Sequence, residues 1–234
     1  MKLTKAERHQ VKLRLGLSGA SGFGKTYSAL LLAKGMSSSW DKILVVDTEN
    51  KSSTLYANRL CGSGPRFFFH SLSGSFEPEK FIEVIAEAEK QGFETIVIDS
   101  SSHEWEAEGG CLALQQMLGG RYTDWKPVKT RHAKFVSAIV NSSCNIICTA
   151  RGDDAYTLEG KTPVKVGMGI KQEKGFEFEF DITFMIGNKN HLAIASKDRT
   201  FLWGDRPPTI LTEEHGQELL QWATEGANPL SDAI

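Results

Sequence analysis

The chain has 234 residues, of which 40% are hydrophobic and 24% charged, which is enough to bury one sizeable core or at most two small ones. The formal net charge of −2 excludes a global field that would attract nucleic acid or an anionic membrane, so such binding needs a local patch. The first ten residues are charged where a signal peptide needs an apolar core, and no apolar run approaches the ~18 residues of a membrane span. We therefore expect a cytoplasmic protein without a membrane partner.

The first half of the chain alternates short apolar runs with helical patterns. Residues 12–18 predict a strand, which a glycine cluster joins to a helix over 25–35. Further strands are expected at 42–49, 66–72, 93–100 and 144–150, and helices at 77–91, 104–118 and 129–142. Strands that alternate with helices predict an α/β fold with a mostly parallel sheet and helices on both of its faces.

The pattern changes after Arg151. Residues 152–175 are rich in Gly and Lys with weak periodicity, which predicts a long loop. Residues 176–186 alternate strictly and predict a strand, which a turn over "GNKN" joins to "HLAIAS" as a C-terminal antiparallel hairpin. The last helix is expected after Thr212, a typical N-cap residue.

The four cysteines give no sign of a metal site. Cys61, Cys111, Cys144 and Cys148 form no CxxC pair, and Cys144 and Cys148 fit one face of a strand. We expect reduced, buried thiols.

The glycine cluster has the spacing of a phosphate-binding loop, Gly19-x4-Gly24-Lys25-Thr26. Glycines let backbone N–H groups turn toward phosphate oxygens, and the helix N-terminus adds a positive dipole. Lys25 would reach the β- and γ-phosphates of ATP, and the Thr26 hydroxyl would bind Mg²⁺. The expected nucleotide-binding residues are Gly19, Ala20, Ser21, Gly22, Phe23, Gly24, Lys25, Thr26 and Tyr27.

Acidic residues end two of the expected strands. Asp99 follows "TIVI" and is the candidate second residue on the metal side, since ligands bind at the carboxyl edge of a parallel sheet. Asp47 and Glu49 end the strand before it, and Glu49 could polarise the water that attacks the γ-phosphate. Glu104 is the rival for that role, and His103 beside it is a candidate sensor of the γ-phosphate or a structural histidine.

These segments together resemble the RecA/RadA-type ATPase core. The resemblance rests on "GASGFGKT", "ILVVDTE" and "IVIDSSSHEW". More narrowly, "DWKPVKTRHAKFVSAIVNSSCNIICTAR", "VKVGMGIKQEKGFEFEFDITFMI", "ASKDRT" and "LTEEHGQELLQW" resemble small AAA-type, RecA-like phage ATPases of single-strand annealing and recombination. The resemblance covers roughly residues 11–224. It predicts one ATPase domain between a charged segment at 1–10 and a flexible tail at 225–234.

The resemblance implies ATP-dependent action on single-stranded DNA by a ring or filament of subunits in a phage-infected or prophage-carrying bacterial cell. It gives Glu49 the water-activating role and Asp99 the metal-side role. Lys197 and Arg199 resemble the basic pair that RadA proteins present to a neighbour's nucleotide, so both are expected catalytic residues. A single-strand DNA-binding protein is a further expected partner.

Basic residues with interleaved aromatics mark two candidate DNA-binding segments. Residues 121–134 contain five Lys or Arg residues against one Asp, together with Tyr122 and Trp125. This composition suits sequence-tolerant binding of single strands. The loop at 152–175 adds lysines but is close to neutral overall. The candidate DNA-binding residues are Arg121, Trp125, Lys129, Arg131, Lys134, Lys165 and Lys171.

Two other functions remain open from the sequence. A nucleotide-dependent assembly or loader protein would bind ATP and hydrolyse little of it. A small-molecule kinase would need an acceptor pocket and usually an Arg-rich lid, and no compact Arg cluster follows the phosphate loop. The response of ATP turnover to single-stranded DNA and to small acceptors separates the three.

Overall fold

The structure is a computed structural model that describes residues 5–159, 162–187 and 190–226, with backbone alone for 153–159 and 162–169. Its centre is a sheet with the strand order β3-β2-β4-β5-β1-β7-β8-β9. The parallel part contains β1 (Arg14–Gly19), β2 (Ile43–Asp47), β3 (Phe68–Ser71), β4 (Thr95–Asp99), the first half of β5 (Asn145–Glu159) and β7 (Ile182–Ile186). The antiparallel strands β8 (Leu192–Asp198) and β9 (Thr209–Ile210) complete one side.

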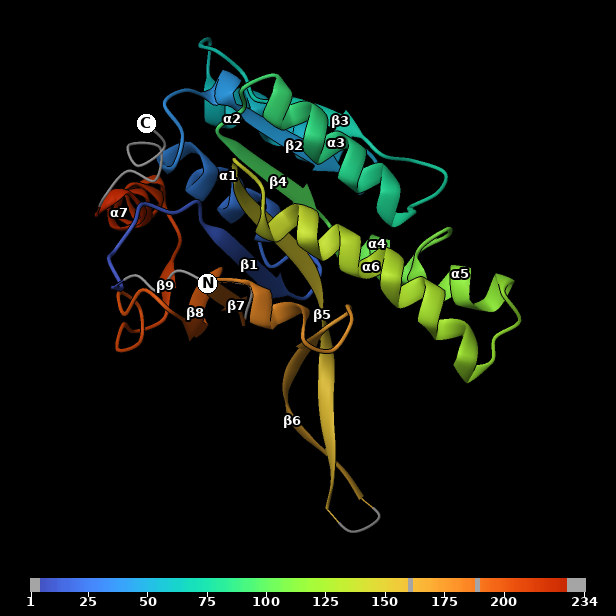
Figure 1. The fold of residues 1–234 in the computed structure, drawn as a ribbon. Coiled ribbons are helices and arrows are strands. Elements are labelled where there is room, and N and C mark those ends of the chain that lie inside the picture. The colour runs from blue at the N-terminus through green and yellow to red at the C-terminus, as the bar shows by residue number, and fades with distance from the viewer. Residues whose placement is uncertain (1–4, 160–161, 188–189, 227–234) are drawn as a thin grey trace.

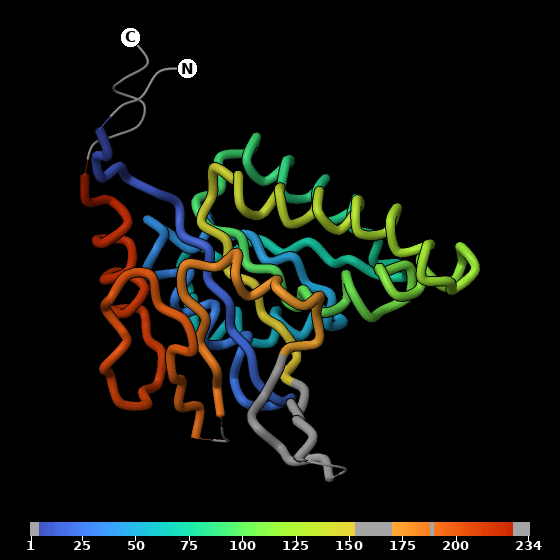
Figure 2. Tube along the Cα trace, turned by 60° about the horizontal axis from the view of Figure 1, so that its bottom comes forward, coloured from blue at the N-terminus to red at the C-terminus, as the bar shows by residue number. Residues whose placement is uncertain are grey.

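Helices cover both faces of this sheet (Figures 1 and 2). One face carries α1 (Lys25–Gly35) and α7 (Glu213–Thr224), and the opposite face carries α3 (Pro78–Lys90) and α6 (Trp125–Val140). The shorter helices are α2 (Ala57–Cys61), α4 (Ser102–Glu106) and α5 (Cys111–Met117), with 3₁₀ turns η1 (Trp40–Lys42), η2 (Ser52–Tyr56), η3 (Tyr122–Asp124) and η4 (Phe176–Glu179). The predicted α/β fold, with a mostly parallel sheet and a C-terminal antiparallel hairpin, is confirmed.

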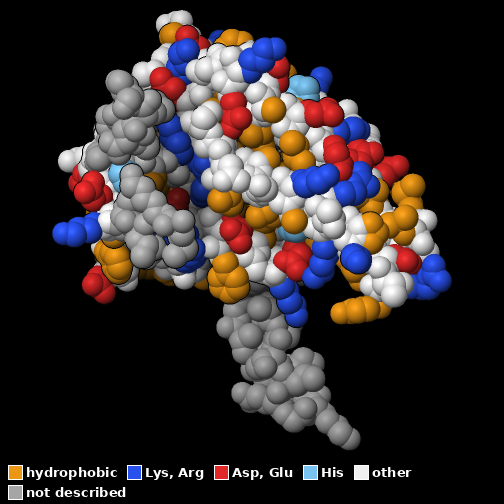
Figure 3. Space-filling view, viewed as in Figure 1, with side chains coloured by type: hydrophobic (Ala, Val, Ile, Leu, Met, Phe, Trp, Pro, Cys, Tyr) orange, Lys and Arg blue, Asp and Glu red, His pale blue; other side chains and the backbone are white. Residues whose placement is uncertain are grey.

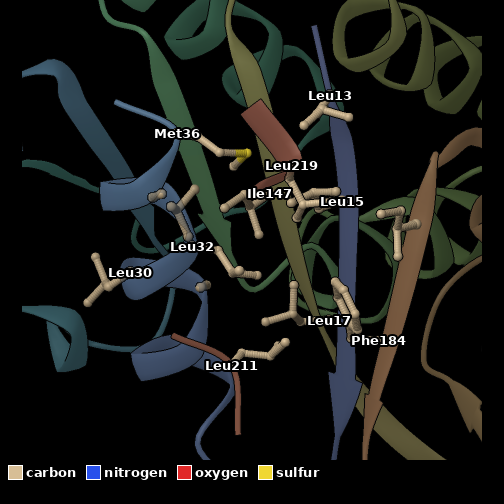
Figure 4. Close-up of a cluster of buried hydrophobic side chains, with 14 of the residues drawn as sticks. Leu13, Leu15, Leu17, Leu30, Leu32, Met36, Ile147, Phe184, Leu211 and Leu219 are labelled. Atoms are coloured by element: carbon tan, nitrogen blue, oxygen red, sulfur yellow. The ribbon is translucent and has the colours of Figure 1, made fainter. Parts of the chain in front are cut away.

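Alternate residues of the central strands feed two separate cores. Val45, Val97 and Ile147 face the helices α1 and α7, whereas Val46 and Ile98 face α3 and α6. Figure 4 shows the first of these cores, with Leu15 and Leu17 of β1 on one side, Leu32 of α1 on the other and Ile147 of β5 between them. A parallel strand that is buried on both faces needs apolar residues at every position, which is why these strands are continuous apolar runs in the sequence.

Glycines allow α1 and α7 to pack backbone against backbone. A Cβ added at Gly216 would lie 2.4 Å from the carbonyl oxygen of Leu32, and one added at Gly35 would lie 2.1 Å from that of Glu213. Both distances are shorter than any real contact of a Cβ atom. Thr212 caps α7 as expected, and its backbone N–H donates to His215 Nδ1.

Residues 176–186 are not one strand, which corrects the sequence prediction. The segment begins with the turn η4, and only β7 is extended. Phe176 and Phe180 are each 2% exposed, whereas Phe178 between them is 72% exposed. The phenylalanines alternate because Phe176 and Phe180 lie on one side of a helical turn. Their rings pack edge to face with centroids 5.0 Å apart.

Residues 152–175 are not a long loop, which is a second correction. Strand β5 continues past the sheet to Glu159 and pairs with β6 (Thr162–Ile170) as an antiparallel arm, from Gly152 opposite Ile170 to Glu159 opposite Thr162. Figure 1 shows this arm extending away from the body of the molecule. The sequence did contain a strand signal, because Val164, Val166, Met168 and Ile170 alternate with Lys165, Gly167 and Gly169 in β6, and the frequent glycines and charged residues of 152–175 obscured it.

Two helix predictions need smaller corrections. The helix expected at 104–118 is divided into α4 and α5 by Gly109, whose φ of +73° is outside the helical range. The helix expected at 129–142 begins earlier, at Trp125. The strands expected at 66–72 and 144–150 and the helix at 77–91 are confirmed as β3, the start of β5, and α3.

The N-terminal segment lies on the last helix. Arg8 stacks 4.4 Å from the ring centroid of Trp222, and the Val11 N–H donates to the Ala223 carbonyl at 2.9 Å. Residues 227–234 of the expected flexible tail lie outside the described residues. In the described part of the chain, no helix combines the length and the apolar character that crossing a bilayer requires.

We expect Gly216→Ala to lower the melting temperature by ~2–10 °C, because a methyl group forced between α1 and α7 costs ~1–3 kcal/mol. Differential scanning fluorimetry measures the change. Gly204→Ala is the matched control, since a Cβ there meets nothing within 4 Å. Equal melting temperatures for the two variants would show that α7 shifts without cost.

Candidate functional site

The glycine loop joins β1 to α1 in the conformation that its sequence predicts. Gly22 and Gly24 have φ angles of +79° and +92°, in the left-handed region that favours glycine. Gly24 is the N-cap of α1, so the free backbone N–H groups of the first helical turn point into the loop. Lys25 Nζ donates to the carbonyl oxygens of Gly19 at 2.9 Å and Ala20 at 3.0 Å, so the ammonium lies across the loop.

A buried carboxylate lies directly beneath this loop. Asp99, at the end of β4, is 2% exposed and accepts hydrogen bonds from the hydroxyls of Thr26, at 2.7 Å, and Thr149. These three residues come from α1, β4 and β5. A hydroxyl and a carboxylate beside a phosphate-binding loop supply the hard oxygen ligands that Mg²⁺ prefers.

Burial changes the proton affinities of the charged groups here. It raises the pKa of Asp99, and the negative charges of Glu49 and Asp47 add to this, while the hydroxyls of Thr149 and Thr26 oppose it. Burial also lowers the pKa of Lys25, although Asp99 and Glu49 attract its charge. A cation bound beside Asp99 would favour the ionised form of its carboxyl group.

Glu49 is positioned by the turn that follows β2. Asp47 is fully buried, and its carboxylate accepts hydrogen bonds from the backbone N–H groups of Glu49 at 2.9 Å, Lys51 at 3.0 Å and Ser53 at 3.0 Å. Asp47 therefore fixes the path of the backbone. The carboxylate of Glu49 stays half-buried at the edge of the cavity.

Arg151, which follows the core part of β5, forms an ion pair with Glu49. Its guanidinium donates to both carboxylate oxygens, at 2.9 and 3.1 Å from Nη2, and also lies 3.5 Å from Glu106. Lys171 Nζ is 3.5 Å from the other oxygen of Glu106. His103 Nε2 is 3.9 Å from Glu49, and burial together with Arg151 lowers the pKa of His103.

Glu49, Arg151 and Lys171 line one cavity of ≈ 760 Å³, which is large enough for a nucleotide, whereas His103 and Glu106 are not part of its wall. Of the predicted nucleotide-binding residues, Ser21, Gly22, Gly24, Lys25, Thr26 and Tyr27 line it, as do Glu49 and Asp99. Gly19, Ala20 and Phe23 belong to the loop and are not part of the cavity wall; Gly19 and Ala20 contribute the carbonyls that hold Lys25.

Aromatic side chains form another part of the cavity wall. Tyr27 and Tyr56 pack edge to face with ring centroids 5.5 Å apart, and the Arg59 guanidinium lies 5.6 Å from the Tyr27 ring. All three line the cavity. Flat rings and a guanidinium plane are suited to stacking against a nucleobase.

Glu104 lies in a different environment from Glu49. It is 0% exposed, and its carboxylate contacts Cys111 Sγ at 3.1 Å, His132 Nδ1 at 3.1 Å and Gln172 Nε2 at 3.2 Å. It does not line the nucleotide-sized cavity. Burial and the neighbouring Glu104 raise the pKa of the Cys111 thiol. Between the two candidate bases, the geometry favours Glu49.

Lys197 and Arg199 lie outside the cavity of their own chain. Lys197 Nζ donates to the carbonyl oxygens of Glu177 at 3.3 Å and Phe178 at 2.6 Å, and burial lowers its pKa. Arg199 donates to the Phe178 carbonyl at 3.0 Å, and its side chain is 57% exposed. Both cations therefore contact η4, and Asp198 between them accepts hydrogen bonds from Thr200 and Trp203.

Acidic neighbours occupy most basic residues of the first DNA-binding candidate. Arg131 forms two hydrogen bonds with Glu79, at 2.8 and 2.6 Å, Lys129 lies 3.4 Å from Glu173, and Arg121 lies 3.5 Å from Asp124. The Trp125 ring stacks on the Trp105 ring, with centroids 5.6 Å apart. Figure 3 shows Lys and Arg side chains mixed with Asp and Glu on this face, whereas apolar side chains gather near α5. Lys134 is exposed.

The second candidate segment is divided between two places. Lys171 follows β6, lines the cavity and pairs with Glu106, while Lys165 lies within β6 on the arm. Of the candidate DNA-binding residues, Lys171 is therefore the one that belongs to the cavity wall.

Arg151, Tyr56, Arg59 and His191 are cavity residues that the sequence reasoning missed. Arg151 directly follows the apolar strand "CNIICTA", so its place at the carboxyl edge of a parallel strand was a usable signal. His191 gave no such signal. It comes from the turn before β8, and its Nδ1 lies 2.8 Å from the Phe23 carbonyl of the loop.

Comparison with known proteins identifies a family. The family model described as an AAA domain matches residues 11–207. No curated protein sequence matches the chain. Among solved structures, a KaiC-like protein from the hyperthermophilic archaeon Pyrococcus horikoshii OT3 has a TM-score of 0.46 and 17% identity over 85% of this chain and 83% of that one. An ATPase from the type III secretion system of pathogenic bacteria has a TM-score of 0.43 and 15% identity over 74% of this chain and 50% of its own.

Asp99→Asn should raise the melting temperature by a few degrees at pH 7.5 without divalent cations. A raised pKa means that the folded state holds the Asp99 proton more tightly than the unfolded state, whose reference value is 3.8. Stability is therefore lost as the pH rises through the raised pKa. The gap between variant and wild type should widen from acid to neutral pH.

Melting curves between pH 4 and pH 8 test this expectation, with Asp205→Asn at an exposed position as the control. A gap that stays constant with pH would show that burial of the Asp99 charge does not limit stability.

Proposed function

This chain belongs to the AAA domain family, and we propose that it hydrolyses ATP with Mg²⁺ while acting on single-stranded DNA in phage-type recombination or annealing. It is a nucleotide-binding P-loop ATPase domain by family. The observation that carries the proposed hydrolysis is the joint presence of Lys25, the Thr26–Asp99 pair and Glu49 around one cavity. What we propose beyond the family is that the chain hydrolyses ATP, that it uses Mg²⁺ and that it acts on single-stranded DNA.

The site has a fitting place for the metal. Thr26 Oγ1 and Asp99 Oδ2 are hard oxygen donors 2.7 Å apart, and Asp99 is a buried carboxylate whose charge a cation would balance. In our proposal, these two residues would hold Mg²⁺ together with phosphate oxygens and water. When bound, the ion neutralises negative charge on the phosphates. Lys25 would leave the loop carbonyls to contact the β- and γ-phosphates.

Glu49 is the proposed group that orients the attacking water. It lines the same cavity as the loop and is held in place by the Asp47 turn. Its carboxylate is also paired with Arg151, so it must leave the guanidinium before it can accept a hydrogen bond from the attacking water. This observation supports slow basal hydrolysis until the pair opens. It also favours the alternative that the chain is an assembly or loader protein with little hydrolysis.

The arm is the proposed DNA contact. It is rooted at the cavity, because Arg151 precedes Gly152 of the arm, and Lys171 follows Ile170 at its other end. Two of the four Lys and Arg residues on α6, Lys129 and Arg131, are paired with acids, which leaves these two less free for phosphates. Movement of the arm on binding DNA would pull on Arg151 and so release Glu49.

We further propose that the chain works as an oligomer in which Arg199 completes a neighbour's site. Arg199 is exposed and does not line the cavity of its own chain. A guanidinium supplied from a neighbour can neutralise charge that develops on the γ-phosphate. Lys197 has a more structural role in this proposal, since its ammonium is surrounded by carbonyl oxygens of η4.

Glu49→Gln should slow ATP hydrolysis at least ~100-fold in the presence of single-stranded DNA, while ATP binding is retained, because an amide cannot accept the proton of the attacking water. Steady-state phosphate release measures turnover, and a fluorescent ATP analogue measures binding. Glu83→Gln, at an exposed position on α3, is the matched control. Unchanged turnover in Glu49→Gln, with loss in Glu104→Gln, would transfer the role to Glu104.

Lys165→Ala should weaken binding of single-stranded DNA and reduce the slope of log K against log salt by ~0.7, the value for one lost phosphate contact on a single strand. Fluorescence anisotropy with labelled oligonucleotides at several salt concentrations measures both effects. Lys134→Ala, at an exposed position on α6, is the comparison variant. If Lys134→Ala shows the loss and Lys165→Ala does not, DNA binds α6 and the arm has another role.

A further inference from the structure

A second cluster of chemically active side chains lies outside the nucleotide site. Glu104 of α4, Cys111 of α5 and His132 of α6 place one potential metal-ligating atom each within 4.8 Å of one another. Glu104 and Cys111 are 0% exposed and His132 is 7% exposed. We propose that Glu104, Cys111 and His132 form a structural binding site for a divalent transition metal, with Zn²⁺ as the best fit.

The distances between the ligand atoms suit a single ion. Glu104 Oε1 lies 3.1 Å from Cys111 Sγ, and His132 Nδ1 lies 3.1 Å from both Glu104 oxygens. Metal–ligand bonds of ~2.0–2.3 Å in a tetrahedral site put ligand atoms about 3.3–3.6 Å apart. The two distances to Glu104 would need to lengthen by a few tenths of an ångström, and Cys111 Sγ and His132 Nδ1, which lie within 4.8 Å of each other, would settle at a similar separation around the ion. The equal distances from His132 also allow the carboxylate to bind through both oxygens, which gives four donor atoms from three residues.

The donor set selects the class of metal. A thiolate, an imidazole and a carboxylate together are typical ligands of Zn²⁺, while Mg²⁺ and Ca²⁺ prefer oxygen alone. Charge also balances, since the Cys111 thiol would release its proton to solvent on binding. One thiolate, one carboxylate and one divalent cation sum to zero. A neutral assembly is the form in which charges are least costly to bury.

The surroundings support the ligands from outside. Gln172 Nε2 donates to Glu104 Oε2 at 3.2 Å and to the Ser101 carbonyl at 2.9 Å, which orients the carboxylate. The His132 ring is surrounded by Trp105, Phe135 and Phe176, at centroid distances of 5.3, 6.2 and 6.1 Å. These rings keep the imidazole in place and limit the access of water.

The alternative is a metal-free hydrogen-bond network, in which the thiol, the imidazole and the Gln172 amide all donate to Glu104. A thiol is a weak donor, and a serine hydroxyl would serve such a network better. This difference makes Cys111→Ser the diagnostic change. It keeps a donor for Glu104 and removes the soft ligand.

The proposed site does not depend on ATP hydrolysis or DNA binding. It would join α4, which follows Asp99 closely in the chain, to α5 and α6. An ion there would therefore stabilise the region that carries the nucleotide-site carboxylate. Cysteine spacing gave no hint of it, because the three ligands are 7 and 21 residues apart in the sequence rather than paired.

The test uses the full chain, stripped with a chelator and then titrated with Co²⁺ or Zn²⁺. We expect one equivalent of Co²⁺ to produce a cobalt–thiolate charge-transfer absorption band. With millimolar Mg²⁺ present to occupy the oxygen ligands Thr26 and Asp99, Zn²⁺ at a hundredfold excess over Kd should raise the melting temperature by about 5–10 °C. Cys111→Ser should lose both signals, and Cys144→Ser, a buried thiol outside the cluster, should keep them.

His132→Asn is the second variant, for use if Cys111→Ser does not fold, and it should lose the same two signals. Because the absorption band requires sulfur, binding of Co²⁺ at Thr26 and Asp99 cannot produce it. The proposal is overturned if the wild-type chain shows no band, or if the band and the Zn²⁺ shift persist in Cys111→Ser. A wild-type chain without the band would leave the hydrogen-bond network as the explanation, and signals that persist in Cys111→Ser would place the metal on another cysteine.

Discussion

The buried contact of Asp99 with Thr26 and Thr149 is the interaction on which the site depends. It joins the start of α1 to the ends of β4 and β5, so the phosphate loop cannot move far without breaking it. The contact follows from the sheet, because β5 lies between β1 and β4 and brings their carboxyl ends to one edge. A buried carboxylate is costly for the fold, and a bound cation would balance its charge.

Local sequence features predicted much of the fold and of the loop side of the site. Apolar runs such as "ILVVD" identify strands that are buried on both faces, and the glycine spacing identifies the strand-to-helix turn. Asp99 and Glu49 could be placed because a carboxylate after such a run lies at the ligand edge of a parallel sheet. In each case the signal is contained within a few neighbouring residues.

The remaining features depend on contacts between distant parts of the chain. Glu49 pairs with Arg151, 102 positions away, and Glu104 meets His132 across 28 positions. No local pattern specifies such partners. The phenylalanines of 176–180 also depend on distant contacts. Alternate phenylalanines are typical of a strand, but here Phe176 and Phe180 belong to a 3₁₀ turn and share a core cluster with residues of α6. The acidic partners of Arg131 and Lys129, Glu79 and Glu173, likewise come from other segments. They neutralise basic residues that the sequence alone presents as free for phosphates.

The continuity of β5 has a mechanical consequence. One strand of 15 residues passes from the core of the sheet, through the root of the cavity, to the far end of the arm. Its outer eight residues span about 26 Å at ~3.3 Å per residue, so a rotation of roughly 10° at the root would displace the tip by about 5 Å. A rotation of the arm would therefore pivot at its base, beside Arg151. Small rearrangements around a phosphate group would be amplified at its tip, and forces applied at the tip would be concentrated on the ion pair at its base.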